Sequence, residues 1–154
     1  MTPKRGIEKM NIRVVYYSGY KGNTKKVATA IAEALNVRAE QIGKDEIKFS
    51  EPVDLLFIGS GIYSHKPHKK ASALIKEMNP VIVKNAVAFG TYGNQSEIGE
   101  QIKMLLQEQE LNVLSEPFVC KGASVGTDNK GHPNAIDLQN AKEFAENIVA
   151  RSIG

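Results

Sequence analysis

The sequence has few of the features that mark specialised classes of protein. It contains one cysteine, Cys120, in 154 residues, so no internal disulfide can form. No apolar run approaches the roughly 20 residues of a membrane-spanning helix, and residues 1–11 lack the apolar stretch of a secretion signal. Lys and Arg exceed Asp and Glu only by 20 to 17, and they are scattered. We therefore expect a cytoplasmic protein without a membrane span or a nucleic-acid partner.

The chain is long enough for one hydrophobic core and too short for two comfortable domains. No strand or helix pattern occupies the first ten residues. We expect a short disordered extension over residues 1–10 and a single domain over residues 11–154, which we expect to be monomeric.

Short apolar, β-branched segments alternate with segments whose apolar residues recur at helical spacing. The last helix is expected to begin near Pro133, with Asn134 as its N-cap. Strands that alternate with helices predict a parallel sheet covered on both faces, an α/β fold. The expected strands are residues 12–17, 37–42, 54–58, 86–89 and 114–120.

Three turns follow strands that are expected at the centre of this sheet. In open parallel sheets, ligands bind beyond the carboxyl ends of the strands, where the strand order reverses. The turns at residues 18–24, 59–68 and 90–96 are therefore expected to converge on one site.

The first of these turns joins a buried strand to a helix, where free backbone N–H groups and the positive end of the helix dipole attract anions. The hydroxyls of Ser18 and Thr24 can donate to phosphate, and the glycines let the chain curl closely around it. The turn lacks the Gly-Lys-Ser/Thr ending of a P-loop and does not complete a dinucleotide motif. An ordinary strand–helix turn with Asn23 as the N-cap is the alternative interpretation.

Four stretches together resemble the flavodoxin family over about residues 11–150. YYSGYKGNTKKVATAIA is similar to the flavodoxin phosphate loop, and GSGIYSHKPHKKASALI and FGTYGNQ are similar to the loops after the third and fourth strands. The segment from VCKG through GHPNAIDLQNAKEFAENI resembles the closing strand and helix. The resemblance implies a flavodoxin-like three-layer αβα sandwich, a five-stranded parallel sheet of order 2-1-3-4-5, and bound FMN.

The resemblance also implies which residues contact FMN. Tyr92 is the first candidate for stacking on the outer face of the flavin ring, with Tyr63 or Ile62 on the inner face. Gly61 corresponds to backbone that changes its contact with flavin N5 on reduction, which a residue without Cβ permits. The expected cofactor-binding residues are Ser18, Gly19, Tyr20, Lys21, Gly22, Asn23, Thr24, Ser60, Gly61, Ile62, Tyr63, Ser64, Thr91, Tyr92, Gly93, Asn94 and Gln95.

The sequence departs from the family pattern in several places. It has no tryptophan to stack on the flavin, Tyr20 and Lys21 lengthen the phosphate loop, and Asn94 stands where Asp is frequent. Where flavodoxins are acidic, this chain is basic. We expect a less negative reduction potential and acidic-surfaced partners, although lysines in the exposed first turns of a helix would give the same pattern. The basic residues are His65, Lys66, His68, Lys69 and Lys70.

The histidines and the cysteine do not form a recognisable metal site. His65 and His68 lie in a lysine-rich loop without accompanying carboxylates or thiolates, and Cys120 is expected on a buried strand. His132 adds no further ligand pattern.

The sequence favours an electron carrier that passes single electrons between a reductase donor and an acceptor enzyme. The alternative is an FMN-dependent oxidoreductase on the same fold, of the quinone reductase or protoporphyrinogen oxidase type. Such enzymes use longer loops or a dimer interface to build a substrate cavity, and the connections here are short. A receiver-like signalling domain needs an Asp at the end of the third strand, whereas Asp54 stands at its start.

Overall fold

The computed structural model describes residues 10–123 and 129–153, so the extension expected at residues 1–10 lies almost entirely outside the described residues. The elements alternate between strand and helix along most of the chain. They are β1 (Ile12–Tyr16), α2 (Asn23–Leu35), β2 (Ala39–Gln41), β3 (Leu55–Tyr63), β4 (Lys66–Pro67), α3 (Lys69–Lys76), β5 (Asn85–Tyr92), α4 (Ile98–Glu108), β6 (Asn112–Val113), β7 (Phe118–Lys121) and α5 (Ala135–Ile153).

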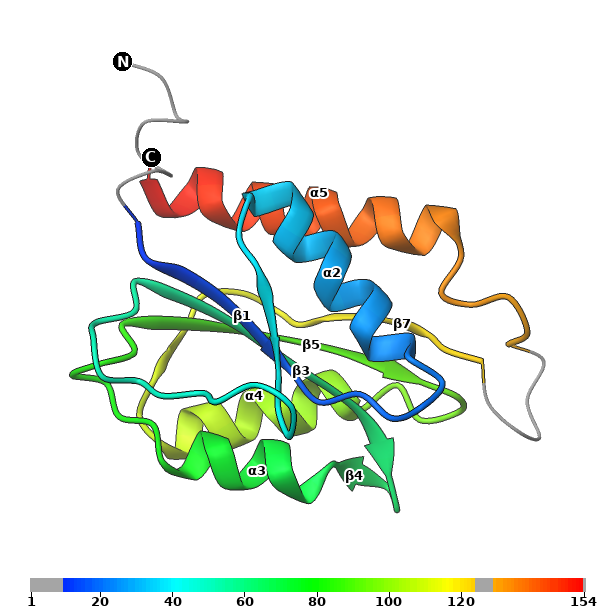
Figure 1. Ribbon diagram of the computed structural model, residues 1–154, viewed down its shortest axis with the longest axis horizontal. Helices are drawn as coiled ribbons and strands as arrows, with labels where there is room; N and C mark the ends of the chain where they lie inside the picture. Colours follow the sequence, from blue (N-terminus) through cyan, green and yellow to red (C-terminus); the bar gives the residue numbers. More distant parts are fainter. Residues whose placement is uncertain (1–9, 124–128, 154) are drawn as a thin grey trace.

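The sheet has the order β2-β1-β3-β5-β6, with β7 beside the far half of β5. All of these pairings are parallel. Figure 1 shows α2 and α5 on one face of the sheet and α3 and α4 on the other. The predicted αβα sandwich of order 2-1-3-4-5 is therefore confirmed, with β6 and β7 together in the fifth position.

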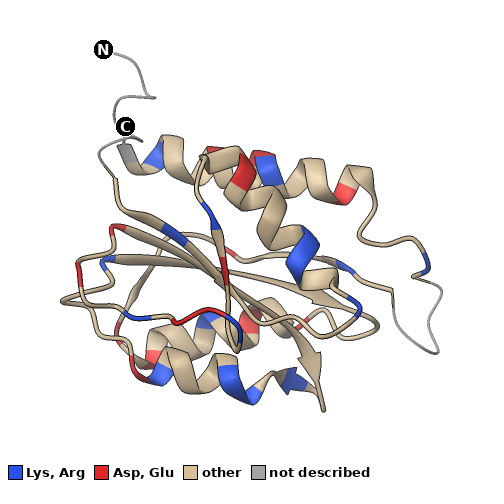
Figure 2. Cartoon of the chain, viewed as in Figure 1, with Lys and Arg blue, Asp and Glu red and all other residues tan. Residues whose placement is uncertain are grey.

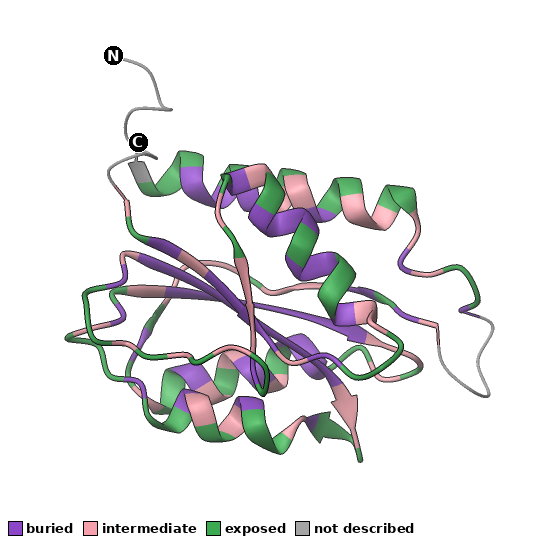
Figure 3. Cartoon of the chain, viewed as in Figure 1, coloured by how far each residue is buried: buried purple, intermediate pink, exposed green. Residues whose placement is uncertain are grey.

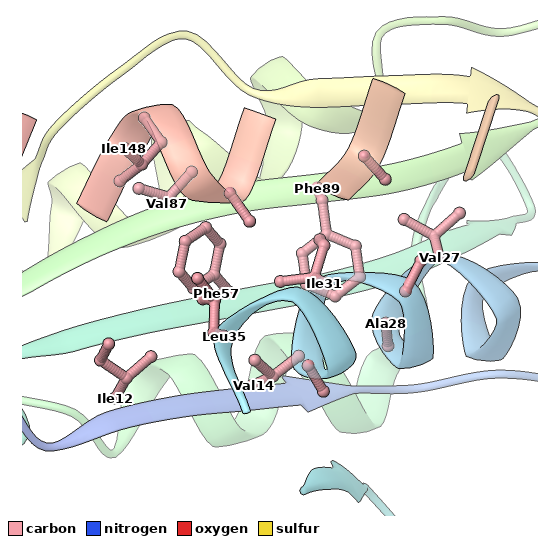
Figure 4. Close-up of a cluster of buried hydrophobic side chains, with 14 of the residues drawn as sticks. Ile12, Val14, Val27, Ala28, Ile31, Leu35, Phe57, Val87, Phe89 and Ile148 are labelled. Carbon is pink, nitrogen blue, oxygen red and sulfur yellow. The ribbon is translucent and has the colours of Figure 1, made fainter. Parts of the chain in front are cut away.

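Side chains alternate between the two faces along each central strand, as the twofold period of a strand requires. Phe57 and Phe89 point toward α2 and α5, whereas Ile58 and Ala88 point toward α3 and α4. Figure 4 shows the hydrophobic cluster that contains Phe57 and Phe89. Figure 3 shows that the buried residues lie along the sheet and on the inner faces of the helices. Two continuous apolar cores hold the sheet rigidly between its helices.

The third strand is longer than predicted, because the glycines expected to end it lie inside it. Gly59 pairs with Phe89 and Gly61 pairs with Thr91 on β5. A Cβ on Gly59 would lie 2.3 Å from the Phe89 ring, so this glycine leaves room for a large core side chain. The sequence pattern predicted a turn at these glycines, but they lie in the strand, where Gly59 makes room for the Phe89 ring.

The fifth strand is interrupted rather than continuous over residues 114–120. Ala86 pairs with Val113 and Phe89 pairs with Phe118. Three residue steps along β5 therefore correspond to five residue steps along the segment beside it. The two extra residues form a bulge between β6 and β7. The bulge carries Pro117 against α4, where a Cβ on Gly99 would lie 2.7 Å from the proline ring. Proline has no N–H for the ladder, which accounts for the break.

One pairing in the sheet is antiparallel. β4 pairs with the end of β3 through Ile62–Pro67 and Tyr63–Lys66. Only two residues, Ser64 and His65, join the two strands, and a connection this short allows only an antiparallel hairpin. This short hairpin is an addition to the predicted five-stranded parallel sheet, and it lies at the edge of the predicted site.

Candidate functional site

The loops after β1, β3 and β5 meet at one edge of the sheet and enclose a cavity of about 470 Å³. That volume lies within the range of about 300–1,000 Å³ that is typical of small-molecule sites. The cavity brings together fifteen of the seventeen predicted residues; Ser60 and Ser64 do not line it. The lining residues are Ser18, Gly19, Tyr20, Lys21, Gly22, Asn23, Thr24, Gly61, Ile62, Tyr63, His65, Thr91, Tyr92, Gly93, Asn94, Gln95, Gly122 and Ala123.

The β1–α2 loop presents free backbone donors to this cavity. Gly22, with φ +72°, precedes the first helical residue, and its N–H donates to the Gly19 carbonyl at 3.0 Å. Within the described chain, the backbone N–H groups of Tyr20, Lys21, Asn23 and Thr24 make no hydrogen bond. Unpaired N–H groups at a helix N-terminus form an anion site.

The two hydroxyls expected to contact phosphate are both buried and already positioned. Ser18 Oγ accepts a hydrogen bond from the Lys25 N–H at 3.2 Å. Thr24 Oγ1 lies 2.8 Å from Thr91 Oγ1, so the start of helix α2 is linked to the end of strand β5 at the cavity. Because one threonine donates to the other, the pair keeps one hydroxyl proton for a further acceptor.

Asn23 does not cap α2, so the N-cap role that the alternative interpretation gave it is wrong. Asn23 lies within α2, and its side-chain Nδ2 donates to the Ala123 carbonyl at 2.9 Å. A Cβ on Gly122 would lie 2.7 Å from that amide nitrogen, so the glycine permits the close approach. The loop after β7 thereby becomes the fourth wall of the cavity.

Gly122 and Ala123 line the cavity although they were not among the predicted site residues, and the sequence contains a signal for them. They directly follow the last strand, whose carboxyl end lies at the same edge of the sheet as those of β1, β3 and β5. Asn129 closes this side further, because its Nδ2 donates to the Gly93 carbonyl at 2.7 Å.

Tyr63 is held in place by two other rings. Its ring meets Tyr17 edge-on, with centroids 5.5 Å apart, and meets His68 edge-on at 4.9 Å. Tyr17 and His68 stack on each other at 3.6 Å. Burial raises the pKa of the Tyr63 hydroxyl, with a smaller contribution from Tyr17, so the phenol stays protonated at neutral pH. These contacts leave Tyr63 as a fixed wall of the cavity.

The β3–β4 turn contains the strained backbone of the site. Ser64 and His65 have φ values of +53° and +69°, a left-handed conformation that residues with a Cβ adopt at a cost of about 1 kcal/mol or more each. The His65 ring bonds the Gln95 side chain, and Gln101 Nε2 donates to the His65 carbonyl at 2.9 Å. These bonds connect the turn to the loop after β5 and to α4.

The expected backbone change at Gly61 stays a prediction. Gly61 lies inside β3 and pairs with Thr91. Its missing Cβ leaves space in the cavity, since a Cβ there would lie 3.4 Å from Thr24 Oγ1.

The lining residues in the described chain include no Asp or Glu, and Lys21 supplies a positive charge beside the free N–H groups. This set fits FMN, whose phosphate needs backbone donors and a cation, and whose ring needs flat side chains such as Tyr63 and Tyr92. Among the described residues, no group of three His, Cys, Asp or Glu side chains gathers as for a metal ion. Burial raises the pKa of Cys120 to about 12, which keeps the thiol protonated.

We predict that the burial of His68 makes the folded protein less stable in acid. His68 Nδ1 accepts from the Lys70 N–H at 3.0 Å and caps α3. Its pKa is lowered by burial, and further by Lys70 and Lys69. Since an unfolded histidine takes up its proton near pH 6.5, the unfolded state binds the proton first as the pH falls. The stability from neutral His68 is therefore present above about pH 6.5 and is lost below it.

Replacing His68 by Asn keeps a capping acceptor and removes the titration. Urea unfolding at about pH 7.5 and about pH 5 should show a smaller loss of stability in His68→Asn than in the wild type. An equal loss in both proteins would contradict this assignment.

Comparisons with known proteins agree with this fold. The flavodoxin domain profile matches residues 14–124. An uncharacterised protein of Methanocaldococcus jannaschii is 33% identical over 150 residues, covering 91% of this chain and 99% of that protein. None of the described helices is long and apolar enough to cross a membrane.

Two solved structures have the same fold. A flavodoxin from the domain Archaea matches with a TM-score of 0.73 at 20% identity, covering 92% of this chain and 98% of its own. The rubredoxin oxygen:oxidoreductase of Desulfovibrio gigas matches with a TM-score of 0.74 at 15% identity, covering 93% of this chain and 36% of that enzyme. Since the matched profile spans residues 14–124, from β1 past the end of β7, the chain belongs to the flavodoxin family.

Proposed function

We propose that the cavity binds FMN and that the protein carries single electrons between redox proteins. A flavodoxin domain supports flavin-dependent electron transfer or oxidoreductase chemistry. The choice of FMN rests on one observation: four N–H groups that make no hydrogen bond within the described chain line one cavity together with Lys21, Tyr63 and Tyr92.

Each part of the cavity has a separate role in this proposal. The β1–α2 loop binds the phosphate through backbone N–H groups, and the Thr24–Thr91 pair offers one more hydroxyl proton. Tyr63 and Tyr92 border the flat ring, and His65 with Gln95 forms its rim. Bound FMN supplies the redox chemistry, because its ring accepts and releases electrons singly.

The features of the cavity favour a carrier over an enzyme with its own substrate. The residues that line it are almost all those expected to contact FMN, which leaves little lining for a second molecule. Steady-state NADPH oxidation in the presence of a quinone tests the enzyme alternative. Rapid turnover would support an FMN-dependent oxidoreductase and would contradict the carrier proposal.

Titration with FMN tests the binding proposal directly. We expect purified protein to quench FMN fluorescence stoichiometrically and to bind riboflavin, which lacks the phosphate, far more weakly. Photoreduction of the loaded protein should then proceed through resolvable one-electron and two-electron spectra. Protein that stays colourless and leaves the fluorescence of excess FMN unchanged would refute the proposal.

A further inference from the structure

A groove runs between α3 and α4 on the face of the sheet opposite α2 and α5. It encloses about 520 Å³ and is separate from the cofactor cavity. Lys66, Lys69 and Lys76 lie along its α3 side, and Met104 and Leu105 of α4 form an apolar side. We call it the α3–α4 groove.

The lysines of the α3–α4 groove carry uncompensated charge. All three are exposed, and none lies within 4.0 Å of a carboxylate of the described chain. Glu108 is the one acidic residue that lines the groove, so three positive charges face one negative charge. Figure 2 shows Lys and Arg residues gathered on β4 and the start of α3.

The lysines that follow β3 in the sequence do not all lie at the same place on the surface. Lys69 and Lys76 are seven residues apart and therefore share one face of α3, and Lys66 of β4 lines the same groove. Lys70 lies elsewhere, since a Cβ on Gly43 of the β2–β3 connection would be 3.8 Å from its Nζ.

The groove also has an apolar anchor point. Met104 is 59% exposed, and Leu105 is half-buried beside it. A flexible, polarisable methionine on an open surface adapts to varied partner surfaces. Apolar contact beside a charged rim is the arrangement of protein–protein interfaces, whereas nucleic-acid binding rests chiefly on phosphate contacts.

The groove lies next to the proposed FMN site. Lys66 lines the groove, and its neighbour His65 lines the cavity. Gln101 lines the groove and donates to the His65 carbonyl. A protein seated in the groove would therefore lie directly beside the cofactor edge, where electrons can leave.

We propose that the α3–α4 groove docks an acidic redox protein that presents carboxylates around an apolar side chain. This proposal rests on the proposed electron-carrier function and names the partner class of the same site. The lysine row steers and orients the partner, and Met104 contributes the apolar contact.

The test uses FMN-loaded protein and two oxidised probes of opposite charge, an acidic [2Fe–2S] ferredoxin and a basic cytochrome c. Backbone NMR shifts at low ionic strength should change on α3, α4 and β4 when ferredoxin is added, and not when cytochrome c is added. The variant Lys66→Ala/Lys69→Ala/Lys76→Ala should weaken ferredoxin binding about tenfold. The matched control Lys48→Ala/Lys84→Ala/Lys142→Ala removes three exposed or half-exposed charges elsewhere and should weaken it much less.

A second variant tests the apolar contact, because Met104→Ala leaves every charge in place. It should weaken ferredoxin binding several-fold without changing its salt dependence. Ferredoxin shifts on another face, equal weakening by the two triple variants, or preferential binding of duplex DNA or anionic vesicles would overturn the proposal. FMN titration of each variant, done separately, tells a failure of docking from a failure of cofactor binding.

Discussion

Lys21→Glu should lower the affinity for FMN by about 30-fold and leave the affinity for riboflavin nearly unchanged. Lys21 lines the cavity beside the free N–H groups of the β1–α2 loop. Reversing one charge at about 7 Å from a phosphate, with an effective dielectric near 40, costs about 2 kcal/mol, which is roughly 30-fold in the dissociation constant. Fluorescence titration with both ligands measures the two affinities.

The comparison of the two ligands makes this prediction specific to the phosphate end. Lys44→Glu makes the same charge change outside the cavity and should leave FMN binding within about twofold of the wild type. An equal loss of affinity for riboflavin and FMN would show that the substitution disturbs the fold. An unchanged FMN affinity would contradict the assignment of the phosphate to this loop.

Gly59→Ala should destabilise the protein by about 2 kcal/mol, although it adds only a methyl group. The new Cβ would lie 2.3, 2.4 and 2.6 Å from three atoms of the Phe89 ring, which is fully buried between the sheet and its helices. The ring has no open space to enter, so strand or ring must shift. Urea unfolding measures the change, and we expect Tm to fall by about 6 °C.

A second substitution tests this cause. Phe89→Leu alone should destabilise the core by removing ring atoms, whereas Gly59→Ala/Phe89→Leu should be less destabilised than the sum of the single changes. Additive losses would mean that the methyl group does not act through the ring. Gly131→Ala is a poor control, because the positive φ of Gly131 would strain any residue with a Cβ. Ala150→Gly, at an exposed helical position, is a better control for the effect of one methyl group on stability.

The sequence predicted the fold because the fold depends on periodicity. Residues 55–58 and 86–89 are apolar throughout, as strands covered on both faces are, and the helices each show an apolar stripe. The order of the loops along the chain then placed the cavity, since the carboxyl ends of parallel strands share one edge. Fifteen of the seventeen cofactor-binding residues that the resemblance implied line this cavity.

The errors arose where one residue type has two possible uses. Gly59 and Gly61 were read as turn residues, but they lie in a strand that needs to lack side chains. Asn23 was an alternative N-cap, but its amide reaches the Ala123 carbonyl, 100 residues away in the chain. Local pattern cannot distinguish these uses, because the deciding contact comes from a distant segment.

The amino-acid order by itself determined the alternation of strands and helices, the loop that presents free N–H groups and the excess of lysine after β3. Only the tertiary structure decided that Lys66, Lys69 and Lys76 share one groove while Lys70 leaves it, and that His65 links this groove to the cavity. Periodicity and turn chemistry act over a few residues, so the sequence reveals them. Grooves and linked loops depend on how whole elements pack, which is settled only when distant segments meet.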